Sequence, residues 1–507
     1  MKRLLAKTGR FFWSWGFLKF ILWTFTLIVL FYIEEDWRGA RAWAATNAEW
    51  EAKGESFDYN KFIPPPIPDD ENIEALPLFK LERGAGGDVY FDSQGALQRA
   101  MLPRVELPSR GNWMRGELPN REKIRNSMAL DYAAAFPGAI PPADTLAQFN
   151  ALCPFMADLR MASASRPLCR FNLDYTVFPP YSRTLVPVTN AIRLSQFLTL
   201  HAVLALDHQQ PDLALEDIKI DYKLLPAAAR DPSLVGGLVA IGINAITQGA
   251  IYDGLALHAW DDAQLAELEQ TLGRVDFLAD YQFAMRSEAA VSTCDIDALK
   301  NAPRNLISGL VNGVSDSSTH PWIDVPFLWP HGWWDQDKSQ IAPFFFQDLT
   351  AVDPQSHRVF PQVDLDLTKR TQQACSRWDA NAPWNFWLTL GAPSFGHTAQ
   401  KFAYGQSWID EAQIACALER YRLAHGIYPG SLDALTPAYI DELPHDIMSG
   451  KPYHYRLQPD GTYLLYSVGW NQADDGGKIV FEKGKPDRID YTEGDWVWPA
   501  RKYFGQD

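Results

Sequence analysis

The chain has few cysteines, and they form no pattern that would hold a metal. Five cysteines occur in 507 residues. None belongs to a CxxC pair or lies near histidines at the spacing of a zinc site, so no structural metal cluster is expected. Cys153 and Cys169 are close enough in sequence to form a disulfide in an oxidising compartment. Two buried thiols are an equally good interpretation of the same pair.

Tracts of basic residues are also lacking. Lysine and arginine number 46 against 62 aspartates and glutamates, which gives a formal charge of −16. Binding along nucleic-acid phosphates requires clustered positive charge, so nucleic acid is not an expected partner. The hydrophobic fraction of 47% is typical of packed domains, and the length predicts two or three of them.

Familiar catalytic motifs are missing as well. The sequence has no GxSxG, HExxH, P-loop or GxGxxG pattern, and its ten histidines follow no recognisable order with serines or carboxylates. We therefore predict no catalytic residue and no organic cofactor. Because catalytic groups can assemble from distant positions, SFGH at residues 394–397 or the helix containing ERYRLAH (419–425) could still contribute to a site. Enzymatic activity stays open.

A long apolar run near the N-terminus is the clearest feature present. Residues 11–33 read FFWSWGFLKFILWTFTLIVLFYI, and a helix of this length crosses a bilayer core at about 1.5 Å per residue. Its one charge, Lys19, is expected to extend to the near interface. The flanks are basic before the run (Lys2, Arg3, Lys7 and Arg10) and acidic after it (Glu34, Glu35 and Asp36). We predict a cytoplasmic tail at 1–10, a transmembrane helix at 11–34 and a periplasmic or extracytoplasmic remainder.

The residues after this run connect it to the rest of the chain. Residues 37–53 have high helix propensity, so the membrane helix is expected to continue as a stalk. The stretch FIPPPIPDDEN at 62–72 contains three consecutive prolines and predicts an extended spacer. Stalk and spacer together cover 35–75. A cleaved signal peptide, with AWAA at 42–45 as its cleavage site, is the alternative interpretation of the N-terminus.

Two sections of different character follow. Residues 76–180 are rich in proline and glycine, and they predict an irregular mixed region of short elements. Residues 181–300 predict an α-helical bundle or a repeat-like domain. Its expected helices begin near Thr184, at Pro211, at Pro232 and after a cap at Asp261 or Asp262.

Residues 301–400 form an aromatic-rich region, densest at 320–337 and 343–346. Aromatic side chains in a loop could bind a sugar or peptide or enter a membrane surface, whereas a loop that fills a groove between domains is the simpler interpretation. His320, His331, Asp335 and Asp337 resemble the components of a metal cluster. Only His331 and Asp335 are four residues apart, and Pro330 and Gly332 argue against a helix there. No metal is expected at this position.

The C-terminal section, residues 401–507, predicts a small α+β domain. An amphipathic helix begins near Ser407 and ends at Gly426, a residue suited to a left-handed cap. Strands are expected at Tyr453–Leu457 and Tyr463–Val468, with the turn residues PDG between them. A helix leading into a small antiparallel sheet is the expected result.

Taken in order, this helix, YPGSLDAL, DIMSGKPYHY, YSVG with the loop NQADDGG, and GDWVW resemble the globular head of the major pseudopilin of type II secretion systems. The resemblance covers roughly residues 405–498 and implies a calcium ion in the loop. The matching ligands would be drawn from Val468, Asn471, Asp474, Asp475 and Asp495, whose hard oxygen donors suit calcium. FTLI at 25–28 lacks the preceding glycine and the glutamate at the fifth position of the pseudopilin processing site. Assembly into a pilus is therefore not implied.

The predicted fold class is α+β, with an N-terminal transmembrane helix, a mainly α-helical middle domain and a pseudopilin-like C-terminal domain. The favoured function is a membrane-tethered, non-catalytic interaction or assembly protein of the cell envelope, with an envelope protein as partner. The alternative is an envelope hydrolase or a carbohydrate- or peptide-binding protein that uses residues 320–346. A deep pocket lined by Trp329, Trp333 and a titratable residue would favour the alternative, and a filled core would count against it.

Overall fold

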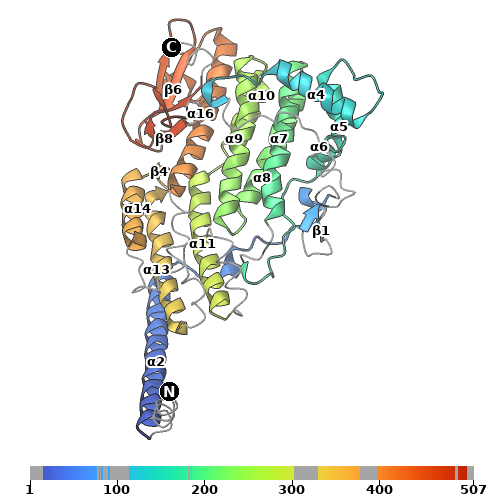
Figure 1. Ribbon diagram of the computed structural model, residues 1–507. Coiled ribbons are helices and arrows are strands. Elements are labelled where there is room, and N and C mark those ends of the chain that lie inside the picture. The colour runs from blue at the N-terminus through green and yellow to red at the C-terminus, as the bar shows by residue number, and fades with distance from the viewer. Residues whose placement is uncertain are drawn as a thin grey trace.

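The N-terminal helix projects from one end of the molecule (Figure 1). Long helices stand side by side beyond it, and small antiparallel sheets lie against them at the far end. The prediction of mixed helix and sheet with an N-terminal apolar helix is confirmed. The computed structural model of the chain describes residues 15–76, 79, 81–83, 89–91, 113–180, 183, 185–301, 329–376, 397–485 and 489–499.

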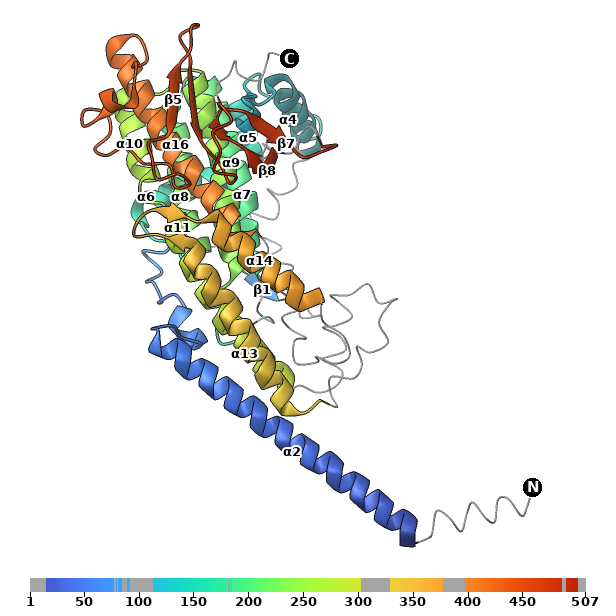
Figure 2. The same ribbon diagram turned by 90° about the vertical axis from the view of Figure 1, so that its left-hand side faces the viewer.

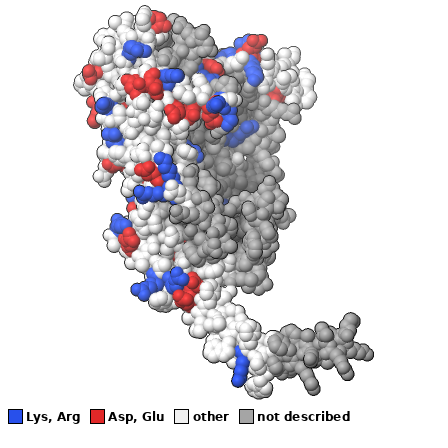
Figure 3. Space-filling view, turned by 60° about the vertical axis from the view of Figure 1, so that its left-hand side comes forward, with Lys and Arg blue, Asp and Glu red and all other residues white. Residues whose placement is uncertain are grey.

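Helix α2 (Trp15–Ala52) runs without interruption from the apolar segment into the body. Most of its large apolar side chains up to Ile33 are exposed, and this part of the surface is almost uncharged (Figure 3). Among the described residues, α2 and α9 (Leu234–Ala256) are long and apolar enough to cross a membrane, but the apolar stretch of α9 is mostly buried. Helix α9 is therefore a core helix. The exposed surface of α2 is of the kind that lipid or a partner covers.

The second half of α2 continues as helix to Ala52, as predicted for residues 37–53, and it lies against the body. It packs along α13 (His331–Asp348), and the two helices run parallel (Figure 2). Gly39 lies so close to Gly332 that a Cβ at residue 39 would be 2.0 Å from the Gly332 carbonyl oxygen. Further along, the rings of Trp50 and Phe346 pack at a centroid distance of 5.0 Å. The two glycines let the helix backbones meet where they cross.

Helix α13 corrects the prediction that Pro330 and Gly332 prevent a helix. Pro330 precedes the helix, where a missing N–H is harmless because the first turn has no intrahelical acceptor for it. The N–H of Gly332 donates to the carboxylate of Asp36 in α2 at 2.8 Å. Trp334 and Phe345 are buried. Residues 331–348 of the aromatic-rich region thus form a packed helix rather than a loop.

Residues 113–180 contain longer helices than the sequence analysis predicted. Asn120 and Asp144 cap two of them, because their side chains accept hydrogen bonds from backbone N–H groups of the first turn. Cys153 and Cys169 are both free thiols, so the dithiol interpretation holds. The helices of this region are α4 (Arg121–Ala135), α5 (Thr145–Leu152) and α6 (Phe155–Ser165), and the strands β1 (Leu81–Arg83) and β2 (Val89–Phe91) precede it.

The helices of the middle section begin close to the predicted positions. Pro211 is the first residue of its helix, as suits a residue without an N–H. Asp261 accepts the N–H of Gln264 at 2.8 Å, and the Gln264 side chain accepts the N–H of Asp261 at 3.0 Å, which is a capping box. With α9, the helices are α7 (Val186–Asp207), α8 (Pro211–Ala229), α10 (Asp262–Leu272) and α11 (Phe277–Lys300).

The C-terminal section has the predicted helix and strands. Helix α16 (Thr398–His425) begins earlier than predicted and ends at Gly426, whose φ of 77° is the expected left-handed cap. Strands β5 and β6 pair antiparallel, with His454 opposite Tyr466. The sheet order is β5-β6-β9, and β7 and β8 form a separate ribbon. The strands are β5 (His454–Leu457), β6 (Tyr463–Ser467), β7 (Ile479–Phe481), β8 (Ile489–Gly494) and β9 (Trp496–Trp498).

One contiguous core joins the helical section to the C-terminal sheet. The ring of Trp113 packs against Trp408 of α16 and Trp498 of β9 at 5.3 and 5.8 Å, and its indole N–H donates to the carbonyl of Ala245 in α9 at 2.8 Å. These contacts fix the position of the C-terminal sheet relative to the helical section. The remaining elements are η1 (Tyr59–Phe62), η2 (Ile73–Ala75), η4 (Trp113–Arg115), η7 (Leu349–Ala351), β3 (Val352–Asp353), β4 (Arg358–Val359), α14 (Pro361–Ser376) and η10 (Leu432–Leu435).

Candidate functional site

A cavity of about 600 Å³ opens where the end of α9 meets α16 and the turn between β5 and β6. These elements meet at the end of the molecule opposite the apolar half of α2 (Figure 1), and we call the cavity the junction cleft. Its lining residues come from three parts of the chain: Tyr252, Leu255, Ala256 and His258; Ala415, Glu419, Arg422 and Gly426–Tyr428; and Leu457, Asp460–Tyr463, Trp498 and Pro499.

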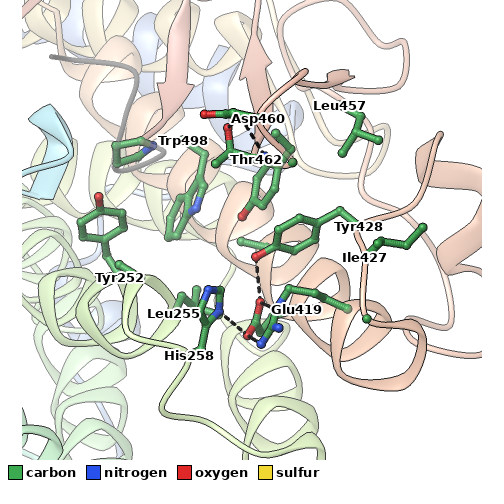
Figure 4. A pocket seen from close by; sticks show the side chains of 17 residues that line it. Tyr252, Leu255, His258, Glu419, Ile427, Tyr428, Leu457, Asp460, Thr462 and Trp498 are labelled. Carbon is green, nitrogen blue, oxygen red and sulfur yellow. Dashed lines mark hydrogen bonds and ion pairs between the residues drawn. The ribbon is translucent and has the colours of Figure 1, made fainter.

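Glu419 is the centre of the polar wall of the junction cleft (Figure 4). Its side chain is 3% exposed. One carboxylate oxygen lies 2.8 Å from His258 Nδ1 and 2.6 Å from Arg422 Nη2. The other accepts hydrogen bonds from the Tyr428 hydroxyl and from Arg422 Nε, both at 2.8 Å. Four contacts from three side chains therefore satisfy this buried carboxylate.

These hydrogen bonds keep Glu419 ionised. Burial raises the pKa of its carboxyl group, but the hydrogen bonds from Arg422, Tyr428 and His258 outweigh burial and lower the pKa below its ordinary value. The same contacts raise the pKa of Arg422, and burial beside Glu419 raises the pKa of Tyr428. At neutral pH the wall holds a paired carboxylate and guanidinium beside a protonated tyrosine. Glu419 is thus an anchor for its neighbours rather than a free base.

His258 has an unusual backbone conformation for a residue with a side chain. Its φ of 53° lies in the left-handed region, which costs about 1–2 kcal/mol for a residue other than glycine. The turn after α9 holds it there, because the His258 N–H donates to the carbonyl of Leu255 at 3.1 Å and the Ala259 N–H to that of Gly254 at 2.9 Å. Its side chain is half exposed. Within the described residues Nε2 has no hydrogen-bond partner, so this atom is available to a ligand.

Apolar side chains form the rim of the junction cleft. Ile427 and Leu457 line it and are 68% and 39% exposed, and Leu257, next to His258, is 40% exposed. Trp498 is buried in its wall. Exposed apolar groups beside a cavity with a few fixed polar groups are typical of binding sites. The cleft can take an apolar group against the rim and a polar group against His258.

Sequence analysis anticipated only one side of this cleft. Glu419 and Arg422 belong to the ERYRLAH helix, and their spacing of three places them on one helix face. His258 and Glu419 are 161 residues apart in the chain, and no local pattern relates them. SFGH lies mainly outside the described residues, which include only its histidine, His397.

A second cavity of about 700 Å³ lies where the proline-rich spacer crosses the body. Pro64, Pro66 and Tyr175 are among its lining residues. Arg170 Nε donates to the carbonyl of Pro64 at 3.2 Å, and its guanidinium group lies over the Tyr175 ring at 5.1 Å. The spacer is therefore held against the body surface instead of extending into solvent.

The residues of the predicted calcium site are Val468, Asn471, Asp474, Asp475 and Asp495. The first four follow β6 in one loop, whereas Asp495 lies between β8 and β9. The Asp495 carboxylate accepts the N–H of Gly477 at 2.6 Å, Asn471 donates to Asp475 at 3.0 Å, and Asp474 accepts the hydroxyl of Tyr466 at 2.9 Å. In the described part of the chain, no three His, Cys, Asp or Glu side chains are placed to hold a metal. The calcium site stays a prediction.

The described part of the aromatic-rich region is filled by contacts. The Trp333 ring packs against Trp329 at 5.9 Å, and its indole N–H donates to Glu35 at 3.0 Å. Asp335 pairs with Lys300 at 2.9 Å. Neither cavity described above is lined by residues 329–346. His320 lies outside the described residues. This packing counts against the alternative function based on the region.

Comparisons with models of protein families, with curated proteins and with solved structures find no match to this chain. The pseudopilin resemblance therefore rests on the residues quoted for it, and the arguments for function rest on the geometry of the junction cleft and of α2.

Proposed function

We propose that the protein is a membrane-tethered, non-catalytic interaction protein of the cell envelope, and that it binds a polypeptide segment of an envelope partner in the junction cleft. The position of the cleft carries the proposal, because the elements that line it are α9, α16 and the turn between β5 and β6. These elements meet at the end of the molecule opposite the apolar half of α2 (Figure 1). In this account α2 crosses the membrane with the N-terminus in the cytoplasm. The cleft then faces away from the membrane on the periplasmic or extracytoplasmic side.

A polypeptide is the occupant that the chemistry of the cleft favours. Pairing between Glu419 and Arg422 cancels their charges, and the rim is apolar. Strand β5 is an outer strand of its sheet in the described part of the chain, because β6 separates it from β9. It ends at Leu457 on the rim. An extended segment could therefore pair with the backbone of β5 and place an apolar side chain in the cleft.

We further propose that residues 401–507 act as a pseudopilin-like head whose acidic loop binds calcium. The order of α16, the Gly426 cap and the antiparallel strands supports this part of the proposal. The ion would stabilise the contact between this loop and Asp495, which already accepts hydrogen bonds from the N–H groups of Asp475 and Gly477. It would have no part in the junction cleft.

Site-specific photo-crosslinking in source membranes tests the proposed binding. Benzoylphenylalanine at Ile427 places a reactive group on the rim. The matched control is the same amino acid at Ile140, which is 92% exposed between α4 and α5. We expect a discrete protein adduct from position 427 that position 140 does not give, with one extended segment of the partner as the crosslinked peptide. Leu457→Arg should reduce the yield at least fivefold.

Three results would contradict the proposal. One is the same set of adducts from both positions, because that would show capture without a site. Another is an adduct at position 427 that Leu457→Arg leaves unchanged. The third is labelling of glycans or lipids alone at position 427, which would assign the cleft to a different class of ligand.

A further inference from the structure

The first turn of α13 lies beside the end of the apolar segment of α2. Phe31 belongs to that segment, and its ring contacts the ring of Trp333 at a centroid distance of 6.1 Å. Trp333 also donates its indole N–H to Glu35 at 3.0 Å and packs against Trp329. Glu35 follows the last apolar residue, Ile33, by two positions. If α2 spans the bilayer, these tryptophan rings lie at the border between hydrocarbon and headgroups.

Side chains at the start of α13 and in the neighbouring part of α2 point toward the proposed bilayer, because both helices run in the same direction. Helices α2 and α13 run parallel, so each points its N-terminal end toward the membrane. Side chains on a helix tilt toward its N-terminus. In α2 this tilt is visible in the contacts: the guanidinium group of Arg41 lies over the Trp37 ring, one turn earlier, at 5.3 Å. Arg38 likewise reaches back to Glu35 at 2.7 Å.

Two of the three acidic residues at this border are paired within the protein, whereas Glu34 is exposed. Glu35 is buried and contacts Arg38, Trp333 and the side-chain amide of Gln336. Asp36 accepts the N–H of Gly332 in the first turn of α13. These carboxylates therefore need no water to satisfy them.

The side chains on the outer surface here include an aromatic and basic pair. Trp37 is exposed, and the guanidinium group of Arg41 lies over its ring. Tryptophan and arginine are residues that favour the depth of lipid headgroups, because each combines an apolar body with a polar end. Trp37 lies about one turn beyond Ile33, the last residue of the apolar segment, and Arg41 about two turns beyond it.

We propose that these residues form a second membrane contact, the interfacial belt. It is made of Trp329, which precedes α13, of His331 and Trp333 of α13, and of Trp37 and Arg41 of α2. The belt rests in the headgroup layer of the leaflet from which the body projects, and its partner is a phospholipid surface. This inference rests on the proposed membrane span of α2, with which the belt is continuous. Two helices at the surface hold the body at a fixed tilt, and so hold the junction cleft at a fixed height above the bilayer.

Photo-crosslinking to lipid tests the belt on the full-length protein in nanodiscs of defined phospholipid. Benzoylphenylalanine is placed at the exposed His331, at Phe25 in the apolar segment, and at Ile140 as the control distant from α2. Intact-protein and peptide mass spectrometry then measure phospholipid adducts. We expect adducts at positions 25 and 331, and at least tenfold less at 140.

The outcomes separate the belt from the span. An adduct at position 25 without one at 331 overturns the belt and leaves the span of α2 intact. The absence of adducts at both positions overturns the belt together with the span on which it rests. Equal yields at 331 and 140 also overturn the belt, because the label at 331 would then reflect random collisions.

Discussion

The crossing of α2 and α13 predicts a large effect from a small substitution at Gly39. A Cβ at this position would lie 2.0 Å from the carbonyl oxygen and 2.4 Å from the Cα of Gly332. Both atoms belong to backbone, so no side chain can rotate away and the helices must separate. The substitution Gly39→Leu is the perturbation, and Ala40→Leu is its control on the same helix, because residue 40 is exposed.

Two opposing effects decide whether Gly39→Leu strengthens or weakens the docking of α2 on α13. Replacing glycine inside a helix stabilises that helix by about 1 kcal/mol, whereas overpacking a close contact costs about 1–3 kcal/mol and more where backbone must move. We expect a net cost of about 2 kcal/mol or more for docking α2 on α13. Separation also breaks the hydrogen bonds from Gly332 to Asp36 and from Trp333 to Glu35.

Hydrogen exchange measured by mass spectrometry in nanodiscs is the assay. A loss of about 2 kcal/mol raises exchange of the amides of residues 331–348 about thirtyfold, because 1.4 kcal/mol is a factor of ten in local opening. Ala40→Leu should leave their exchange within about twofold of the parent. Unchanged exchange in Gly39→Leu would refute the close crossing, and equal increases in both variants would show that the effect is not specific to it.

Three further predictions concern carboxylates. Glu419→Gln should lower the free energy of unfolding at pH 7 by about 1–3 kcal/mol. The pKa of Glu419 is lowered in the folded state, so its stabilising effect is lost as the pH falls below the pKa of a glutamate in the unfolded chain, near 4. Chemical denaturation should therefore show the unfolding free energies of the two proteins converging at low pH. Burial, with a smaller contribution from Asp348, raises the pKa of Asp364 to about 7, so folded protein binds more protons than unfolded protein between about pH 4 and 7 and loses stability as the pH rises through that window. Asp364→Asn should remove this loss of stability, which is on the order of 2–4 kcal/mol. Thermal melts at pH 5 and pH 8 measure it, and an equal pH dependence of the melting temperature in variant and parent would contradict the burial of Asp364. Calcium at 1 mM should raise the melting temperature of the parent more than that of Asp475→Ala. Equal shifts in the two proteins would contradict a calcium ion bound in this loop.

Local signals in the sequence predicted the helices of the middle section well. Pro211 and Asp261 mark starts whose chemistry is complete within a few residues: a proline at the first position, and a capping box with Gln264. Gly426 likewise ends α16 through its own left-handed conformation. None of these features needs a distant partner, which is why the sequence alone was sufficient for them.

Features that depend on distant contacts could not be predicted in this way. Gly332 indicated a break in helix, yet it lies in the first turn of α13 because Gly39 of α2 approaches it. The polar wall of the junction cleft depends on contact between His258 and Glu419, which only the packing of α9 on α16 brings together. The resemblance of residues 405–498 directed attention to the acidic loop rather than to this cleft.

The central claim of this account is that α2 crosses a membrane and holds the whole body on its non-cytoplasmic side. Labelling of single introduced cysteines with a membrane-impermeant maleimide, in spheroplasts before and after lysis, tests it most directly. We expect Ile140→Cys to react fully in intact spheroplasts, and Lys7→Cys to react only after lysis, with the parent protein giving the background from its own cysteines. Labelling of Lys7→Cys before lysis, or protection of Ile140→Cys, would contradict the claim, and release of the protein by alkaline carbonate would show that α2 does not span the membrane.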